Sequence, residues 1–241
     1  VERSRGLGDV YKRQLFNYVF SRQSGGLFLI RVEDTDRERS KKEYEEDIIF
    51  GLEWLGISPD KKPIRQSERS EIYQKAAEKL INSGNAYWCD CSPDDLEEMR
   101  KQQAAAGTKP MYDGRSRDLG LERSDNTVLR LATPLEGETI VKDLIRGEIT
   151  FRNSELDDLI LMRSDGTPTY HFCNVVDDFD QGVTTVIRGE DHISNTPRQI
   201  HIQKALGYPD LEYAHLPLVL GEDKNCLLYT SDAADDMQFV D

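Results

Sequence analysis

The pattern of apolar and polar positions near the start of the chain predicts a strand followed by a helix. Leu27–Val32 is a nearly continuous apolar run after two glycines, which is typical of a strand buried on both faces. Ser40 and Glu43 then form a capping-box pattern, which predicts a helix start. The apolar stripe of that helix consists of Tyr44, Ile48, Leu52 and Leu55. A strand and a helix in this order form half of a βαβ unit.

The same rhythm continues on both sides of a long middle segment. Residues 68–83 predict a second helix, with Ser67 as its cap and Gly84 at its end. The later elements are a strand at 183–187, a helix at 197–206 ended by Gly207, and a strand at 215–220. Strands that alternate with helices predict a parallel sheet.

The middle segment, between Asn85 and Arg163, has a different character. Its strand-like pieces are residues 86–91, 127–132, 149–152 and 159–163. One helix interrupts them, with Ser92 as its cap, Pro93 at its first position and Gly107 beyond its end. The segment therefore predicts a separate, mixed α+β unit.

These elements together predict an α/β protein with a Rossmann-like parallel sheet that is split in sequence by an inserted mixed α+β domain. The expected boundaries are 15–84 for the first half of the sheet domain, 85–165 for the insertion and 166–225 for the second half. Residues 1–14 and 226–241 look foreign to this pattern, and we expect them to be a non-native leader and tail.

Composition limits the class of protein. The 241 residues are 37% hydrophobic and 32% charged, and no apolar run is long enough to cross a bilayer. Four cysteines are too few for a disulfide scaffold, and the start of the chain lacks the apolar stretch of a secretory signal. We therefore expect a cytoplasmic protein with no membrane association. We also expect it to be a monomer. The net charge of -14 argues against a uniformly basic protein that coats nucleic acid.

Two charge clusters follow predicted strands. Glu33, Asp34 and Asp36 come after the first strand, and Arg188 with its neighbours Asp191 and His192 comes after a later one. Ligands of open parallel sheets bind beyond the carboxyl ends of the strands. A carboxylate beside an arginine suits a zwitterion such as an amino acid, because Arg grips a carboxylate through two parallel hydrogen bonds. The alternative interpretation is that these are solvated charges in loops.

Four strings of residues resemble the glutamyl-tRNA synthetase family. They are RVEDTDRERS at 31–40, YDGR at 112–115, DGTPTYHFCNVVDD at 165–178 and VIRGEDHISNTPRQI at 186–200. They occur in the family's order, and the likeness extends from about residue 15 to 225. The resemblance implies a class I aminoacyl-tRNA synthetase catalytic region.

The resemblance also implies roles for single residues. Glu33 matches the residue that holds the amino group of glutamate, and Arg188 matches the arginine that meets a substrate carboxylate. Tyr170 and Asn174 match positions that line the amino-acid pocket, although a core aromatic is the alternative for Tyr170. The two residues that fall where the pocket passes to the nucleotide are Asp191 and His192. No catalytic residue is assigned.

The implied reaction activates L-glutamate with ATP and Mg²⁺ and transfers it to the 3′ end of a tRNA. Positioning and charge stabilisation would supply most of the rate acceleration. The chain lacks both nucleotide-binding motifs of the family, since no His precedes His171 and Lys224 does not stand in a matching lysine loop. We therefore expect this copy to be inactive. Open alternatives are a paralogue that glutamylates queuosine on tRNA(Asp), and a non-catalytic tRNA-binding remnant.

The inserted domain is the implied contact with the tRNA acceptor arm. Lys109, Arg115 and Arg117 are its candidate phosphate contacts, with scattered surface cations as the alternative. Some family members hold zinc with a Cys-x-Cys pair and a second pair after the YDGR string. Here Cys89 and Cys91 are followed by Ser116 and Asp118, and serine is a poor zinc ligand. We therefore expect no zinc or other bound metal.

Overall fold

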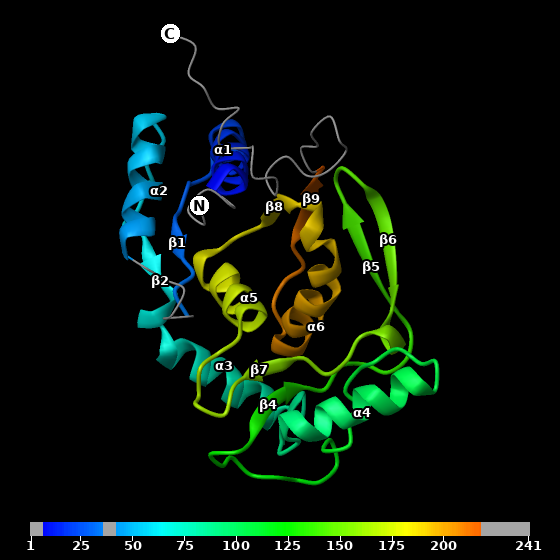
Figure 1. The fold of residues 1–241 in the computed structure, drawn as a ribbon. Helices are drawn as coiled ribbons and strands as arrows, with labels where there is room; N and C mark the ends of the chain where they lie inside the picture. The colour runs from blue at the N-terminus through cyan, green and yellow to red at the C-terminus, as the bar shows by residue number, and fades with distance from the viewer. Residues whose placement is uncertain (1–6, 36–41, 218–241) are drawn as a thin grey trace. The chain divides into compact units, whose positions relative to one another are not determined.

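The computed structural model describes residues 7–35 and 42–217 as a mixed α/β protein (Figure 1). The helices are α1 Leu7–Ser24, α2 Lys42–Trp54, α3 Ser70–Asn82, α4 Pro93–Ala105, α5 Tyr170–Gln181 and α6 Thr196–Leu206. The strands are β1 Arg31–Val32, β2 Ile64–Arg65, β3 Ala86–Cys89, β4 Val128–Leu131, β5 Glu138–Asp143, β6 Gly147–Arg152, β7 Ile160–Met162, β8 Thr185–Gly189 and β9 Glu212–Leu216. Short 3-10 turns cover Gln66–Glu68, Asn153–Glu155 and Glu190–Asn195.

The strands of the described residues form three sheets. β1 pairs with β2 in parallel, whereas β3, β4 and β7 form an antiparallel sheet. The third sheet has the order β6-β5-β9-β8, in which β5 is antiparallel to β6 and parallel to β9. The sequence predicted a parallel sheet split by an inserted mixed α+β domain, and the structure confirms a mixed α/β fold with both parallel and antiparallel pairing. The β5–β6 hairpin was not predicted.

The chain divides into two compact units. The first unit comprises Val1–Arg65, Ile187–Ile193 and Ala214–Asp241, and the second comprises Gln66–Val186 and Ser194–Tyr213. The predicted inserted domain, 85–165, lies within the second unit. The division into a split sheet domain and an insertion stays a prediction, as do the two terminal segments. Residues 1–6 and 218–241 lie outside the described part of the chain.

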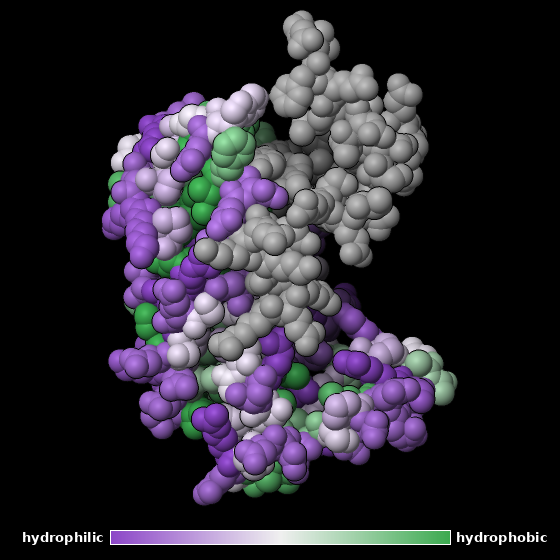
Figure 2. All heavy atoms as spheres, turned by 60° about the vertical axis from the view of Figure 1, so that its left-hand side comes forward, coloured by the Kyte–Doolittle hydropathy of each residue, from purple (hydrophilic) through white to green (hydrophobic). Residues whose placement is uncertain are grey.

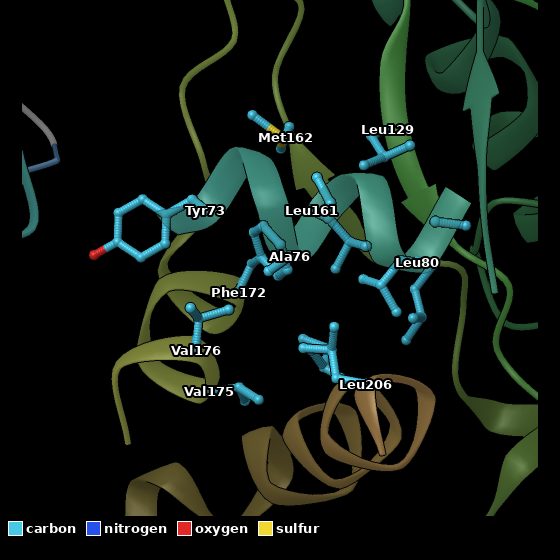
Figure 3. Close-up of a cluster of buried hydrophobic side chains, with 14 of the residues drawn as sticks. Tyr73, Ala76, Leu80, Leu129, Leu161, Met162, Phe172, Val175, Val176 and Leu206 are labelled. Atoms are coloured by element: carbon cyan, nitrogen blue, oxygen red, sulfur yellow. The ribbon is translucent and has the colours of Figure 1, made fainter. Parts of the chain in front are cut away.

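The core of the second unit joins three helices to the β3-β4-β7 sheet (Figure 3). Leu80 of α3, Phe172 of α5 and Leu206 of α6 have no exposed surface, and neither do Leu129 of β4 and Leu161 of β7. Burying an aliphatic or aromatic side chain of this size stabilises the fold by about 1.5–3 kcal/mol. This core therefore fixes the positions of α3 and α5, which carry the polar residues described below.

The first unit has a smaller core, formed by Phe28, Leu52 and Ile57. The segment between α1 and β1 is tied down by Asp60, which accepts hydrogen bonds from the backbone N–H of Phe28 at 2.7 Å and from Arg22 at 2.8 Å. On the face drawn in Figure 2, hydrophilic residues cover most of the described surface and hydrophobic residues form small separate patches.

Several predicted elements are confirmed. α4 begins at Pro93 with Ser92 as its cap in a capping box, and Gly107 beyond its end has a φ of 72°. α6 ends at Gly207, whose φ of 67° is left-handed and strongly favours glycine. β3, β4, β6, β7 and β8 lie within two residues of their predicted limits or overlap them.

Other expectations were wrong. Only Arg31 and Val32 of the predicted strand 27–32 form a strand, β1, and within the described residues this strand pairs with β2. Ser67 does not cap α3; it lies in a 3-10 turn, and the cap position is Arg69 without a side-chain cap bond. The predicted strand 215–220 begins earlier, as β9, and its last three residues lie outside the described part. Helices α1 and α5 and strand β5 were not predicted. The capping residue Ser40 falls outside the described residues.

Candidate functional site

The carboxylates after β1 belong to a small charged cluster in the first unit. Glu33 is 41% exposed and lies 3.5 Å from the guanidinium of Arg31. Asp34 lies 3.8 Å from Arg65 of β2, which also pairs with Glu45 of α2 at 2.6 Å. Parallel pairing of β1 with β2 therefore brings the acidic strand end beside an arginine from the next strand. Asp36 lies outside the described residues.

Arg188, near the end of β8, belongs to the same unit and is buried, at 6% exposure. Its Nε donates a hydrogen bond to Nε2 of His215 on β9 at 3.1 Å, and His215 is fully buried. The accepting nitrogen of His215 must carry no proton, so the imidazole is the neutral tautomer protonated at Nδ1. His215 thus orients the guanidinium plane of Arg188. His215 was not predicted as a site residue, because the sequence does not show that its strand lies beside the strand of Arg188.

The side chain of Asn17 fastens β8 to α1 within the first unit. Its Nδ2 donates to the backbone carbonyl of Ile187 at 3.1 Å, one residue before Arg188. A polar anchor at this place helps to fix the backbone from which Arg188 projects.

The two nucleotide-proximal candidates, Asp191 and His192, follow in the turn after β8. Nε2 of His192 lies 3.6 Å from Oδ2 of Asp191, an ion pair when the imidazole is protonated. A Cβ placed on Gly189 would overlap Oδ1 of Asp191. Glycine at this position therefore leaves room for the Asp191 carboxylate in the conformation that the structure shows.

Tyr170 and Asn174 both lie on α5 in the second unit. Tyr170 is the first residue of the helix, and its ring meets that of His171 edge-on at 5.1 Å between centroids. Asn174 is 6% exposed, and its Oδ1 accepts a hydrogen bond from Nε2 of Gln66 at 3.0 Å. Asn174 is thus held by a residue 108 positions earlier in the chain.

A buried carboxylate, Asp177, organises the polar residues around Asn174. It is fully buried and accepts hydrogen bonds from Gln66 Nε2 at 2.9 Å, Arg69 Nε at 2.8 Å and Tyr73 Oη at 2.9 Å. Burial, followed by the charges of neighbouring acidic groups including Asp177, holds the pKa of the Tyr73 phenol far above its usual value. The phenol therefore keeps its proton and donates. None of these partners was identified from the sequence.

The three predicted phosphate contacts differ in their surroundings. Lys109 is exposed and donates to the backbone carbonyl of Glu155 at 3.0 Å. Arg115 is also exposed, and it pairs with Asp113 at 2.9 Å. Arg117, in contrast, is only 21% exposed and forms a two-pronged ion pair with the buried Asp158. The structure therefore gives Arg117 a structural partner.

Of the two positions compared with the zinc ligands of some family members, Ser116 lies close to the thiol of Cys89. Cys89 is fully buried and its Sγ contacts Tyr112 Oη at 3.3 Å, while Ser116 Oγ contacts Asp90 at 3.4 Å. Burial opposes ionisation of Cys89, but hydrogen bonds from Tyr112 and Ser116 outweigh it and lower the pKa of the thiol. Within the described ranges, no group of three His, Cys, Asp or Glu side chains is arranged to hold a metal.

The family follows from the match of the sequence to known proteins. The pattern described as tRNA synthetases class I (E and Q), catalytic domain, matches residues 8–228. The chain belongs to this family. It is 52% identical over 210 residues to a glutamate–tRNA ligase of Thermodesulfovibrio yellowstonii, covering 87% of this chain and 45% of the relative. It is 50% identical over 227 residues to a glutamate–tRNA ligase of Nitrosospira multiformis, covering 93% and 49%.

Solved structures agree with this membership. The crystal structure of a glutamate tRNA ligase from Elizabethkingia meningosepticum in complex with its amino acid matches with a TM-score of 0.84 at 31% identity, covering 96% of this chain and 50% of that one. A glutamate-tRNA synthetase from Elizabethkingia anophelis matches equally well, with a TM-score of 0.84. The chain spans about half the length of the curated relatives it matches.

The resemblance stated from the four sequence strings is therefore confirmed: the chain is a homologue of glutamate–tRNA ligases at about 50% identity. The described helices include none that is long and apolar enough to span a membrane. The roles given to single residues, the cytoplasmic location and the monomeric state stay predictions.

Proposed function

We propose that this chain is the catalytic region of a glutamate–tRNA ligase, with a Rossmann-like nucleotide fold, that activates L-glutamate with ATP as its Mg²⁺ complex and transfers it to the 3′ end of tRNA. The observation that carries the proposal is the buried Arg188 near the end of β8, whose guanidinium is oriented by His215 of β9. A planar guanidinium in a fixed orientation suits the two oxygens of a carboxylate. Half the length of the relatives is absent from the chain, so the activity is proposed for the region and not for a whole protein.

The amino-acid specificity follows from the same group. A carboxylate accepts two parallel hydrogen bonds from one guanidinium, whereas the neutral amide of glutamine offers one acceptor and leaves the second N–H without a matching partner. Glu33 would supply the complementary negative charge for the amino group of the substrate. Tyr170 and Asn174 are the remaining proposed glutamate contacts, and Asp191 and His192 the proposed residues near the nucleotide.

The proposed tRNA contact is the acceptor arm, bound through the exposed cations Lys109 and Arg115. Both side chains are accessible, and phosphate contacts from such groups position an RNA without reading its sequence. Arg117 is a weaker candidate than its neighbours, because its guanidinium is engaged by Asp158.

Titration of the chain with L-glutamate by NMR tests the proposal, with L-glutamine and D-glutamate as comparison ligands. We expect saturable binding of L-glutamate, binding of L-glutamine at least tenfold weaker, and loss of glutamate binding in Arg188→Gln. Arg198→Gln is the matched control, since Arg198 is a partly exposed arginine that lies 3.5 Å from Asp157 in the second unit. Equal affinity for both amino acids, or unchanged binding by Arg188→Gln, would contradict the proposal.

Exchange of pyrophosphate into ATP, measured with glutamate and tRNA present, provides a second readout. Because the chain lacks both nucleotide-binding motifs of the family, we expect no exchange even where glutamate binds. Exchange that Arg188→Gln abolishes would contradict this expected inactivity and support the complete activation step. Binding of tRNA by a chain that neither binds glutamate nor supports exchange would instead support the non-catalytic module.

A further inference from the structure

The polar residues between α3 and α5 form a chain of hydrogen bonds in which each donor and each acceptor is determined by its neighbours. It begins at the carboxylate of Asp177, which is fully buried and is approached by Tyr73, Arg69 and Gln66. The Arg69 N–H can only donate, and the protonated Tyr73 hydroxyl donates here too. Asp177 therefore accepts a hydrogen bond from each of these three side chains.

The carboxylate fixes the orientation of the Gln66 amide. One hydrogen of Gln66 Nε2 points to Asp177 Oδ2 at 2.9 Å and the other to Asn174 Oδ1 at 3.0 Å. Turning the amide over would place Oε1 against the carboxylate oxygen at the same distance, replacing an attraction by a repulsion between two acceptors. In the observed orientation Gln66 Oε1 is buried without a hydrogen-bond partner, which is unfavourable. Because Nε2 makes two hydrogen bonds only in this orientation, the orientation of the Gln66 amide is strongly determined.

The orientation of Gln66 determines that of Asn174 in turn. Because Gln66 offers a hydrogen, Asn174 must present its oxygen to it, and its Nδ2 then lies at the opposite end of the amide. The only side-chain hydrogen bond of Asn174 to the described part of the chain is the one from Gln66. Some polar atoms of the described residues are enclosed and lack a partner, for example Gln66 Oε1, but Asn174 Nδ2 is not one of them. Nδ2 therefore keeps some accessible surface. Its two hydrogens are therefore available to a ligand.

We propose that Asp177, acting through Gln66, holds the Asn174 amide with Nδ2 toward the substrate, so that Asn174 selects an oxygen acceptor of the amino-acid substrate. This inference rests on the proposed function, in which Asn174 contacts glutamate. Gln66 and Asp177 are positioning residues and do not touch the substrate. A carboxylate oxygen of glutamate fits the donor that Asn174 presents, whereas an ammonium group does not.

The test compares the affinity for L-glutamate of four single variants and one double variant by NMR titration. Gln66→Met keeps the side-chain volume and removes both hydrogen bonds, and it also removes the partnerless Oε1. Asn174 then turns freely, and we expect glutamate affinity to fall roughly 3- to 10-fold, in line with the loss of one hydrogen bond of ordinary strength. Gln203→Met is the matched control, since Gln203 is also buried and its Oε1 accepts from Tyr213 outside this network. Its affinity should not change.

A double-mutant cycle shows whether Gln66 acts through Asn174. In an Asn174→Ala background, Gln66→Met should cause no further loss of affinity. An equal loss in both backgrounds would overturn the inference, because it would mean that Gln66 acts by general destabilisation.

Asn174→Asp tests the polarity directly and keeps the shape of the side chain. Its carboxylate still accepts from Gln66 but presents an oxygen to the substrate, so we expect glutamate affinity to fall at least tenfold. Undiminished binding by this variant would overturn the donor assignment even if Gln66→Met did not fold. If the unmodified chain fails to bind glutamate, the proposed function fails. If it binds and Gln66→Met binds equally well, only the present inference fails.

Discussion

Replacing Arg117 by alanine should destabilise the second unit far more than the same change at its neighbour Arg115. Arg117 donates to the carboxylate of Asp158 through Nε at 2.6 Å and through Nη2, and Nη2 also reaches the carbonyl of Thr133 at 2.8 Å. The Asp158 side chain is only 2% exposed. Arg117→Ala would therefore leave a buried carboxylate without its cation.

The magnitude follows from the partners that remain. Removing one member of a buried ion pair typically costs about 3–5 kcal/mol. Asp158 would keep hydrogen bonds from the Tyr87 hydroxyl and from the backbone N–H of Thr133, the latter at 3.0 Å. These two donors stabilise the negative charge in part, so we expect a loss near the lower limit, about 3 kcal/mol. This corresponds to a change of roughly 100-fold in the unfolding equilibrium constant.

Arg115→Ala is the control, because the Arg115–Asp113 pair has side-chain exposures of 51% and 39%. Such pairs contribute at most about 1 kcal/mol. Urea unfolding can be followed by the fluorescence of Trp88, next to Tyr87 in β3, in a Trp54→Phe background. If Arg117→Ala costs no more than Arg115→Ala, Arg117 is not a structural residue, and its original assignment as a phosphate contact regains its basis.

Three further predictions concern pH, helix capping and metal content. Burial lowers the pKa of His201 below 6.5. As the pH falls below 6.5, the imidazole takes up a proton in the unfolded chain but stays neutral in the folded one. The free energy of unfolding should therefore fall by at most about 1.4 kcal/mol per pH unit. Urea midpoints between pH 7.5 and 5.5 should fall less steeply in His201→Gln, and identical slopes would refute this. Ser92→Ala should cost about 1 kcal/mol and Ser92→Gly only a few tenths, because Ser92 caps α4; equal losses would contradict the capping role. Elemental analysis should find no stoichiometric zinc at Cys89 and Cys91, and one zinc per chain would disprove the sequence prediction.

Elements with strong local signals could be predicted from the sequence. α4 has a cap, a proline at its first position and a glycine beyond its end, and all three act within a few residues. β5 lacks such a signal, because its buried positions are Thr139, Val141 and Asp143 while Ile140 is 49% exposed. Its alternation of buried and exposed positions is regular, but the alternation of apolar and polar residues is not. α5 was missed for a related reason, since its buried side includes Asn174 and Asp177.

The candidate site was predictable only where the family's strings supplied it. The resemblance indicated Asn174 and Arg188, but the residues that orient them are far away in sequence: Gln66 lies 108 positions from Asn174, and His215 lies 27 positions from Arg188. Neither partner has a spacing that identifies it. Such pairings depend on which strands and helices become neighbours, and only the folded structure provides that information.

The pairing of β5 with β9 has a consequence for the order in which the protein can fold during its synthesis. Asp143 meets Tyr213 in this pairing, whereas β5 and β6 are joined by a tight turn. The hairpin can form as soon as it leaves the ribosome, but Tyr213, the partner of Asp143, is translated only about sixty residues after the hairpin ends at Arg152. During that interval the nascent chain exposes a strand edge, and a chaperone that shields such edges would act in this window.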